Sequence, residues 1–132
     1  MVNKYLYVKR AITARLLKLF AAFSSVVISG ARQVGKSTLL DHAFPGVPRI
    51  VFDPVQDIQN ARADPELFLN NNPPPVILDE IQYAPELIPA IKRRIDTLQK
   101  PGLYLLIGSQ QWGVLKEVSE SLAGRAASLI GS

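Results

Sequence analysis

Cysteine is absent from this sequence of 132 residues, and histidine occurs once, at His42. The lack of thiols excludes disulfides, thiol catalysis and cysteine metal sites, and it agrees with a reducing cytoplasm. A single histidine makes a histidine-cluster metal site or a Ser-His-Asp triad improbable. These absences therefore exclude several common classes of active site.

The sequence also lacks an apolar run that approaches the roughly 18 uninterrupted residues of a membrane span. Its basic N-terminus followed by apolar residues imitates a signal peptide with a cleavage-like end at Ser29-Gly30-Ala31. Cleavage there would remove the first glycine of the motif described below, so we reject this interpretation. We therefore expect a cytoplasmic protein without a membrane span.

No acidic residue precedes Asp41, although basic residues occur throughout that part and the net charge is +4. Such a charge distribution suits nucleic acid or an anionic membrane, but the solvated face of an amphipathic helix is the commoner explanation. Apolar residues recurring every four positions predict a helix from about Tyr5 to Phe23. We assign residues 1–24 to an N-terminal basic amphipathic helix and residues 25–132 to a core domain.

The most informative segment is Gly30-Ala31-Arg32-Gln33-Val34-Gly35-Lys36-Ser37, which fits the phosphate-binding pattern G-x-x-x-x-G-K-[ST] at every fixed position. An apolar, β-branched run precedes it, and a segment that can form a helix follows. In this strand, loop and helix context, backbone N–H groups and the helix N-terminus bind polyphosphate. Lys36 adds a charge for the β- and γ-phosphates, Ser37 offers a hydroxyl to Mg²⁺, and Thr38 continues the nucleotide-binding segment.

A second decisive segment is Val76-Ile77-Leu78-Asp79-Glu80, in which an apolar strand ends in two adjacent acids. Ligands of open α/β sheets bind at the carboxyl ends of the strands. We expect Asp79 to hold the Mg²⁺ shell and Glu80 to orient and polarise the attacking water. This Walker B pattern is weak by itself, but it becomes strong after a complete Walker A motif.

The rest of the chain alternates strands and helices, which predicts right-handed crossovers and a parallel sheet. Further strands are expected at 49–53, 103–107 and, as a start, 126–130; helices are expected at 64–69, from 85 to 98 and at 119–122. Ser109 or Gln110, after the strand at 103–107, is placed to sense the γ-phosphate or the attacking water, with an ordinary turn as the alternative. The triplet Lys92-Arg93-Arg94 lies outside its helix's apolar stripe, so it is either solvated surface or a contact for a partner or nucleic acid.

The segment Gly30 to Leu40 resembles the P-loop of a prokaryotic group of AAA-type ATPases, in which a C-terminal domain of unknown function follows the AAA domain. The segments 77–82, 85–87, 108–111 and 118–125 are similar to that family in order and spacing, so the resemblance covers nearly the whole chain. It implies a three-layer α/β/α P-loop NTPase fold of the ASCE type, with a mainly parallel sheet. The strand before Ser109 would then lie between the Walker A and Walker B strands.

The resemblance also implies ATP and Mg²⁺ as ligands and an ATPase, a hydrolase, as the complete protein. It assigns Walker A to Gly30 through Ser37, Walker B to Asp79 and Glu80, and sensor 1 to Ser109 or Gln110. Arg125 matches a family arginine that meets nucleotide or a neighbouring subunit. The catalytic set is then Lys36, Glu80, Ser109 and Arg125.

Two departures from the family pattern are visible. Ala31 replaces a common proline, which is harmless because this position contributes backbone. The chain ends soon after Arg125, whereas the family continues with the rest of its ATPase module and its C-terminal domain. We therefore expect a C-terminally truncated core with an unfinished fifth strand and a tendency to self-associate.

Three functions compete. The leading hypothesis is an AAA-type domain that binds Mg–ATP and hydrolyses it by water attack on the γ-phosphate. The second is a nucleotide-binding switch or truncated remnant without hydrolysis, and the third is a nucleic-acid-associated module that uses the basic residues. A GTPase is disfavoured because the Asn-Lys-x-Asp signature is absent, and a small-molecule kinase because Asp79-Glu80 favours water activation.

Overall fold

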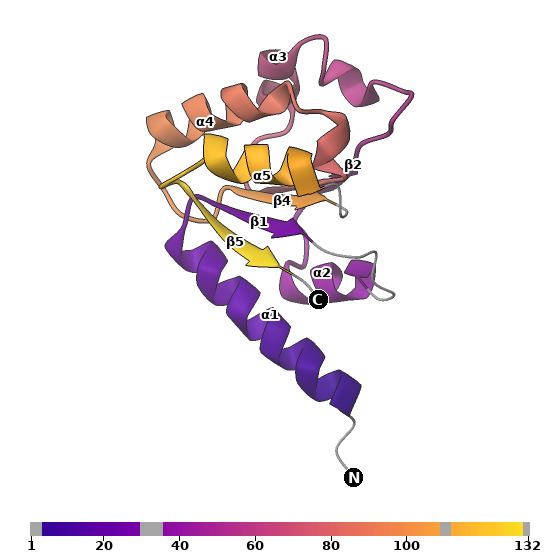
Figure 1. Cartoon of the computed structure of the whole chain (residues 1–132), viewed down its shortest axis with the longest axis vertical. Coiled ribbons are helices and arrows are strands. Elements are labelled where there is room, and N and C mark those ends of the chain that lie inside the picture. Colours follow the sequence, from indigo (N-terminus) through magenta and orange to yellow (C-terminus); the bar gives the residue numbers. More distant parts are fainter. Residues whose placement is uncertain (1–3, 30–35, 109–111, 131–132) are drawn as a thin grey trace.

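Five strands form a single sheet with helices on both faces in the computed structural model, which describes residues 4–29, 36–108 and 112–130 (Figure 1). The elements in chain order are α1 (Lys4–Ala22), β1 (Ser25–Ser29), α2 (Lys36–Ala43), β2 (Arg49–Val51), the 3₁₀ turn η1 (Ile58–Asn60), α3 (Pro65–Asn71), β3 (Val76–Asp79), the 3₁₀ turn η2 (Ile81–Tyr83), α4 (Leu87–Leu98), β4 (Tyr104–Gly108), α5 (Trp112–Ser121) and β5 (Ala126–Ile130). This alternation confirms the predicted α/β class.

The strand order is β2-β3-β4-β1-β5, and every pairing is parallel. β4 lies between β1 and β3, so the strand expected between the Walker A and Walker B strands is confirmed there. β5 pairs with β1 from Ser25 opposite Ala126 to Ser29 opposite Ile130, so the expected fifth strand is present. β5 runs to the last residue that the structure describes, and the expectation that this strand is unfinished stays a prediction.

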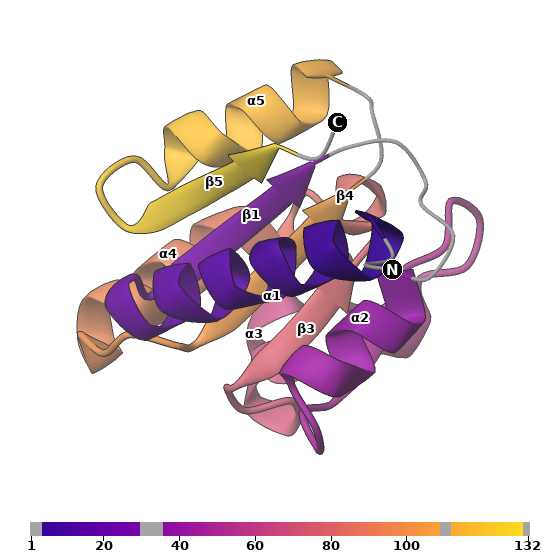
Figure 2. The same ribbon diagram turned by 90° about the horizontal axis from the view of Figure 1, so that it is seen from below.

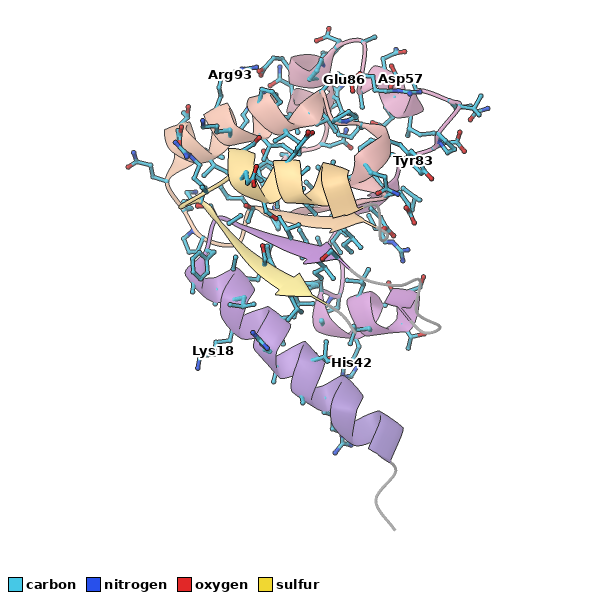
Figure 3. The ribbon with its side chains drawn as sticks, viewed as in Figure 1. Lys18, His42, Asp57, Tyr83, Glu86 and Arg93 are labelled. Carbon is cyan, nitrogen blue, oxygen red and sulfur yellow. The ribbon has the colours of Figure 1, made fainter. Side chains whose placement is uncertain are left out.

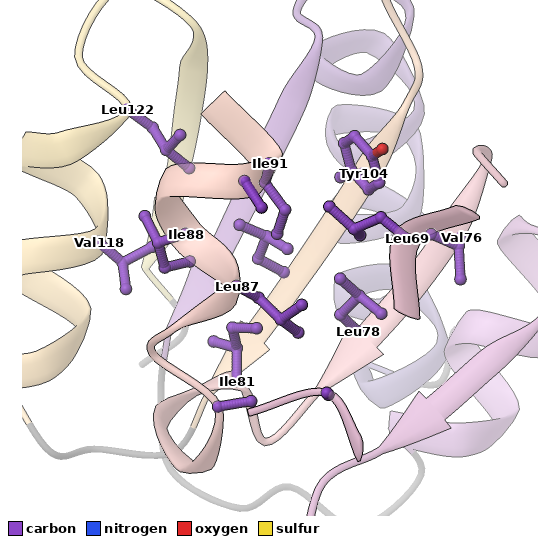
Figure 4. Packing of buried hydrophobic residues seen from close by; sticks show 14 of the residues in the cluster. Leu69, Val76, Leu78, Ile81, Leu87, Ile88, Ile91, Tyr104, Val118 and Leu122 are labelled. Carbon is purple, nitrogen blue, oxygen red and sulfur yellow. The ribbon is translucent and has the colours of Figure 1, made fainter. Parts of the chain in front are cut away.

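The two faces of the sheet carry separate hydrophobic layers, because successive side chains of a strand point to opposite faces. Val76 and Leu78 of β3 belong to the layer under α3, α4 and α5, which Figure 4 shows at close range. Ile77, between them, belongs to the layer under α1 and α2. The three layers are visible in Figure 2, in which α1 crosses one face of the sheet while α5 and α4 lie beyond it.

Helix boundaries follow local chemistry, with some corrections to the predicted ones. Asp64 caps α3 by accepting a hydrogen bond from the Leu67 N–H at 3.2 Å, and Pro65 fixes the first turn. The apolar stripe of α4 is buried up to Ile95, whereas Leu98, the last residue of the helix, is 37% exposed. α5 is longer than the short helix that we predicted.

The N-terminal helix α1 packs on the sheet through residues between Ile12 and Phe20. Leu16 is fully buried and shares a cluster with Val26 and Leu40, so α1 and α2 cover the same face. Within the described residues, no helix combines the length and the apolar character needed to cross a membrane.

Candidate active site

The carboxyl ends of β1, β3 and β4 point to one edge of the sheet, which we call the carboxyl edge (Figure 2). β1 ends at Ser29 and α2 begins at Lys36, so the predicted glycine loop joins a strand to a helix N-terminus at this edge. The loop residues Gly30, Ala31, Arg32, Gln33, Val34 and Gly35 lie outside the described residues, as does the side chain of Lys36. Their contacts with phosphate remain predictions.

Asp79 is the last residue of β3, and it is only 1% exposed. The alternation of β3 puts Asp79 on the same face as Ile77, which is the face covered by α1 and α2. Its Oδ1 accepts a hydrogen bond from the Glu80 N–H at 2.8 Å. Because a buried carboxylate is costly without cationic or polar partners, the groups around Asp79 decide whether this position is stable.

Arg49 is the cationic partner of Asp79. It is the first residue of β2 and lies opposite Ile77 in the register of the two strands. Its Nε and Nη2 donate to Asp79 Oδ2 at 3.1 and 2.7 Å, and its Nη1 donates to Ser37 Oγ at 2.8 Å. One guanidinium therefore joins the predicted Walker A hydroxyl to the predicted Walker B carboxylate.

Ser37 and Thr38 occupy the first turn of α2, and both are exposed. The structure thus brings Ser37 and Asp79 together, as the metal hypothesis requires, although they come from elements far apart in the sequence. Sequence reasoning missed Arg49, which we had identified only as the start of a strand. The available signal was a basic residue that opens the strand beside the Walker B strand, but its partners depend on a register that the sequence does not reveal.

Glu80 has a backbone conformation that a residue with a side chain seldom adopts. Its φ of 57° and ψ of 44° lie in the left-handed region, at a cost of about 1–2 kcal/mol for a non-glycine residue. The Gln82 Nε2 donates to Glu80 Oε2 at 2.6 Å and so orients the carboxylate. Gln82 belonged to a matched family segment, but we had assigned it no role.

Asp53 follows β2 at the same edge, but its carboxylate stabilises a turn in the chain. Its Oδ1 accepts hydrogen bonds from the Gln56 N–H at 2.8 Å and the Val55 N–H at 2.7 Å. These backbone donors hold the pKa of Asp53 below its ordinary value. The turn therefore stabilises the charged form of Asp53.

The predicted sensor follows β4, which ends at Gly108 between the two strands that carry the site. Ser109 and Gln110 lie outside the described residues, so their sensing role remains a prediction. Their place in the chain puts them directly after the strand that separates β1 from β3.

Arg125 lies at the opposite edge, because it directly precedes β5 and every strand of the sheet runs in the same direction. Its carbonyl accepts hydrogen bonds from the Ser25 N–H at 3.2 Å and from Ser25 Oγ at 3.3 Å, at the start of β1. Its Nε and Nη2 donate to the Asp96 carboxylate at 2.6 and 3.1 Å. The structure does not bring Arg125 to Asp79 and Glu80 within one chain.

The two hydrogen bonds between Arg125 and Asp96 shift the pKa values of both side chains. Arg125 holds the pKa of Asp96 below its ordinary value, and Asp96 raises the pKa of Arg125. Both side chains are partly exposed, at 32% and 50% for Arg125 and Asp96 respectively, so water screens the interaction.

Two residues of the basic triplet of α4, Arg93 and Arg94, share one carboxylate of the same chain. Arg93 donates to Glu66 at 2.7 Å, and Arg94 donates to the same carboxylate at 3.2 Å and to Asn70 Oδ1 at 2.5 Å. The side chain of Arg93 nevertheless points outward from the α3 and α4 layer, on the far side of the sheet from Lys18 (Figure 3). These ion pairs favour a structural role for the two arginines, which link α4 to α3 at the protein surface.

Comparison with known proteins places this chain beside a defined family. A family described as AAA domain matches residues 22–130. Uncharacterized proteins from Mycobacterium bovis and Mycobacterium tuberculosis are each 33% identical to the chain over 118 residues. That alignment covers 89% of this chain but 27% of each relative, so the chain spans about a quarter of the length of these curated relatives.

Proposed function

This chain belongs to the AAA domain family, and we propose that it binds Mg–ATP and hydrolyses ATP by attack of water on the γ-phosphate. The observation that carries the proposal is the convergence of Ser37 and Asp79 on one cation at the carboxyl edge. In the proposed reaction the water oxygen bonds to the γ-phosphorus, and the bond from that phosphorus to ADP breaks. The activity of the longer proteins that resemble this chain belongs to the same proposal.

Phosphate binding is assigned to the connection between β1 and α2. The N–H groups of residues 30–35 and the N-terminus of α2 are suited to an anion, because their partial charges are positive. Lys36 adds a full charge beside the β- and γ-phosphates. The observed strand and helix support this assignment, because they give the loop the setting that the motif requires.

The donor set fits Mg²⁺. The Ser37 hydroxyl and the Asp79 carboxylate are hard oxygen ligands, and Mg²⁺ is usually held by one or two carboxylates together with waters and substrate phosphates. Among the described residues, no cluster of three or more His, Cys, Asp or Glu side chains could hold a metal alone. When bound, Mg²⁺ would neutralise charge on the β- and γ-oxygens.

Glu80 is proposed as the residue that polarises the attacking water and accepts its proton. It follows Asp79 directly, and the Gln82 amide fixes one of its carboxylate oxygens at 2.6 Å. The strained backbone of Glu80 supports the assignment, because such conformations cluster at functional sites. Ser109 or Gln110 is proposed to contact the γ-phosphate, and Arg125 to act across a subunit contact.

ATP binding by calorimetry and phosphate release should be measured together on this chain and on two variants. We expect Lys36→Ala to abolish ATP binding, because the loop loses its full positive charge. We expect Glu80→Gln to keep binding and to lower phosphate release by at least about 100-fold, the usual contribution of a general base. Lys18→Ala and Glu86→Gln are the matched controls, since both alter exposed residues outside the site.

The outcomes separate the candidate functions. Unchanged ATP affinity in Lys36→Ala would refute the phosphate site, and turnover at the parent rate in Glu80→Gln would refute the role of Glu80. Binding without release by the parent would favour the nucleotide-binding switch or truncated remnant that does not hydrolyse ATP. The support for that alternative is that the matched region covers only 27% of the length of each relative, so the relatives contain much that this chain does not.

A further inference from the structure

We propose that Arg49 closes the metal position of the site in the absence of nucleotide, and that Mg²⁺ enters by displacing its guanidinium group. The inference rests on the proposed function, because it takes Ser37 and Asp79 as the metal ligands. It adds a regulatory element, which is a competing cation supplied by the chain itself.

The contacts of Arg49 are those of a cation held between the two proposed ligands. Nη1 donates a hydrogen bond to the Ser37 hydroxyl at 2.8 Å, while Nη2 and Nε donate to Asp79 Oδ2 at 2.7 and 3.1 Å. The second carboxylate oxygen, Oδ1, accepts from the Glu80 N–H at 2.8 Å. The guanidinium therefore takes up two hydrogen bonds of Oδ2 and one of the Ser37 hydroxyl, and it lies between the two oxygens that the proposed Mg²⁺ site would use.

The two cations exclude each other for electrostatic reasons as well. A guanidinium and a divalent ion bound to the same carboxylate oxygen would be within a few ångströms of each other, in a partly buried site where their repulsion is poorly screened. Metal entry and guanidinium departure are therefore one exchange. Asp79 keeps a positive partner before and after it.

Burial decides which partner moves. The Asp79 side chain is 1% exposed and is held at the end of a central strand, whereas the Arg49 side chain is 24% exposed. Arg49 is also the first residue of β2, which is a short edge strand. Its long side chain can swing toward solvent without moving β3, and the charged group that remains behind is then paired by the metal.

The exchange sets a threshold for metal binding. If the closed arrangement holds about nine-tenths of the molecules, the apparent affinity for a free divalent ion falls about tenfold. Nucleotide phosphates add ligands and negative charge next to the site, and these favour the metal over the guanidinium. The site then admits Mg²⁺ chiefly together with nucleotide.

The test is Mn²⁺ binding without nucleotide, followed through the electron paramagnetic resonance signal of the free ion. We expect Arg49→Ala to bind Mn²⁺ about tenfold more tightly than the parent. Arg93→Ala removes the same charge from α4, outside the proposed site, so its affinity should equal that of the parent. Adding Asp79→Asn to Arg49→Ala should remove the gain, because the ion loses its carboxylate.

A second measurement uses the unaltered chain, in case Arg49→Ala does not fold. The NMR signal of the Arg49 Nε–H can be assigned as the one that disappears in Arg49→Lys. We expect slow hydrogen exchange at this group without metal and fast exchange after addition of Mg²⁺ and ATP. Slow exchange that persists at saturating Mg–ATP overturns the proposal.

Equal Mn²⁺ affinities in the parent and in folded Arg49→Ala also overturn it, as does the absence of Mn²⁺ binding in both. ATP binding is measured separately, so the two proposals fail in different ways. Without ATP binding, a higher Mn²⁺ affinity in Arg49→Ala would sink the ATPase assignment and leave the competition standing. If ATP binds and the two Mn²⁺ affinities are equal, the ATP-binding assignment stands and the proposed competition is refuted.

Discussion

Two arginine–aspartate pairs use the same chemistry at opposite edges of the sheet. Arg49 and Asp79 meet at the carboxyl edge, and Arg125 and Asp96 meet at the amino edge; each arginine donates two hydrogen bonds to its carboxylate. The pairs differ in burial, because Asp79 is 1% exposed and Asp96 is 50% exposed. They differ also in their third partner, since Arg49 donates to the Ser37 hydroxyl whereas Arg125 donates to the Ala123 carbonyl.

The comparison shows that geometry alone does not give the energetic weight of an ion pair. An exposed pair loses most of its Coulomb attraction to water and salt, whereas a buried carboxylate depends on its partner. The Asp96 pair can therefore be lost at little cost, and the Asp79 pair cannot be lost unless another cation takes the place of Arg49.

The largest expected effect is on stability without metal. Arg49→Ala should lower the free energy of unfolding by about 3 kcal/mol, because it leaves the Asp79 carboxylate buried beside an empty position. That loss corresponds to a fall of about 10 °C in the thermal midpoint for a domain of this size. Urea and thermal unfolding in the presence of a chelator measure both values.

Arg125→Ala is the matched control, and its stability should stay close to that of the parent. Equal losses in the two variants would show that burial does not separate the pairs. Saturating Mg–ATP should stabilise Arg49→Ala more than the parent, because the metal replaces the missing cation.

A smaller effect is expected from exchanging arginine for lysine. Arg49→Lys keeps the charge but loses the planar fork, so it should cost about 1.5 kcal/mol, the worth of a hydrogen bond to a charged group. Arg125→Lys should change the urea midpoint much less, because water replaces the lost donor. A larger loss in Arg125→Lys than in Arg49→Lys would reverse the comparison.

The smallest effect concerns acid. Because Arg125 holds the pKa of Asp96 below its unfolded-state value, the unfolded chain binds more protons as the pH falls. The stabilisation from this pair is present above about pH 4, the ordinary aspartate value, and is lost below it. Asp96→Asn should therefore give a slightly flatter profile of urea midpoint between pH 5 and 2.5.

The control is the same substitution in the Arg125→Ala background, where the cause of the lowered pKa is gone. There Asp96→Asn should leave the slope of the profile nearly unchanged. An identical flattening in both backgrounds would assign the acid sensitivity to other carboxylates, such as Asp57 and Glu66, whose pKa values are also lowered.

The fold was largely predictable because its signals are local. Apolar runs of strand length alternate with helical segments, and parallel pairing follows from that alternation. The end of β2 was less predictable, because Asp53 turns the chain with its own side chain after Val51. Periodicity places Leu98 on the apolar stripe of α4, but it does not show how much of that stripe the fold covers, and Leu98 is 37% exposed.

The site divides in the same way. Ser37 and Asp79 follow from motifs, and the structure brings them together through Arg49. Arg49 could not be predicted, because its role depends on the pairing of β2 with β3 and on the position of α2. The position of Arg125 was readable in principle, because a residue that directly precedes a strand of a parallel sheet lies at the amino edge.

The left-handed backbone of Glu80 has a consequence for engineering. On conformational grounds, its φ of 57° favours glycine or asparagine at position 80. A library screened only for heat resistance should therefore enrich Glu80→Gly, because that change relieves the backbone while discarding the carboxylate. Thermostable versions of this domain would need a parallel selection for nucleotide turnover to retain the acid.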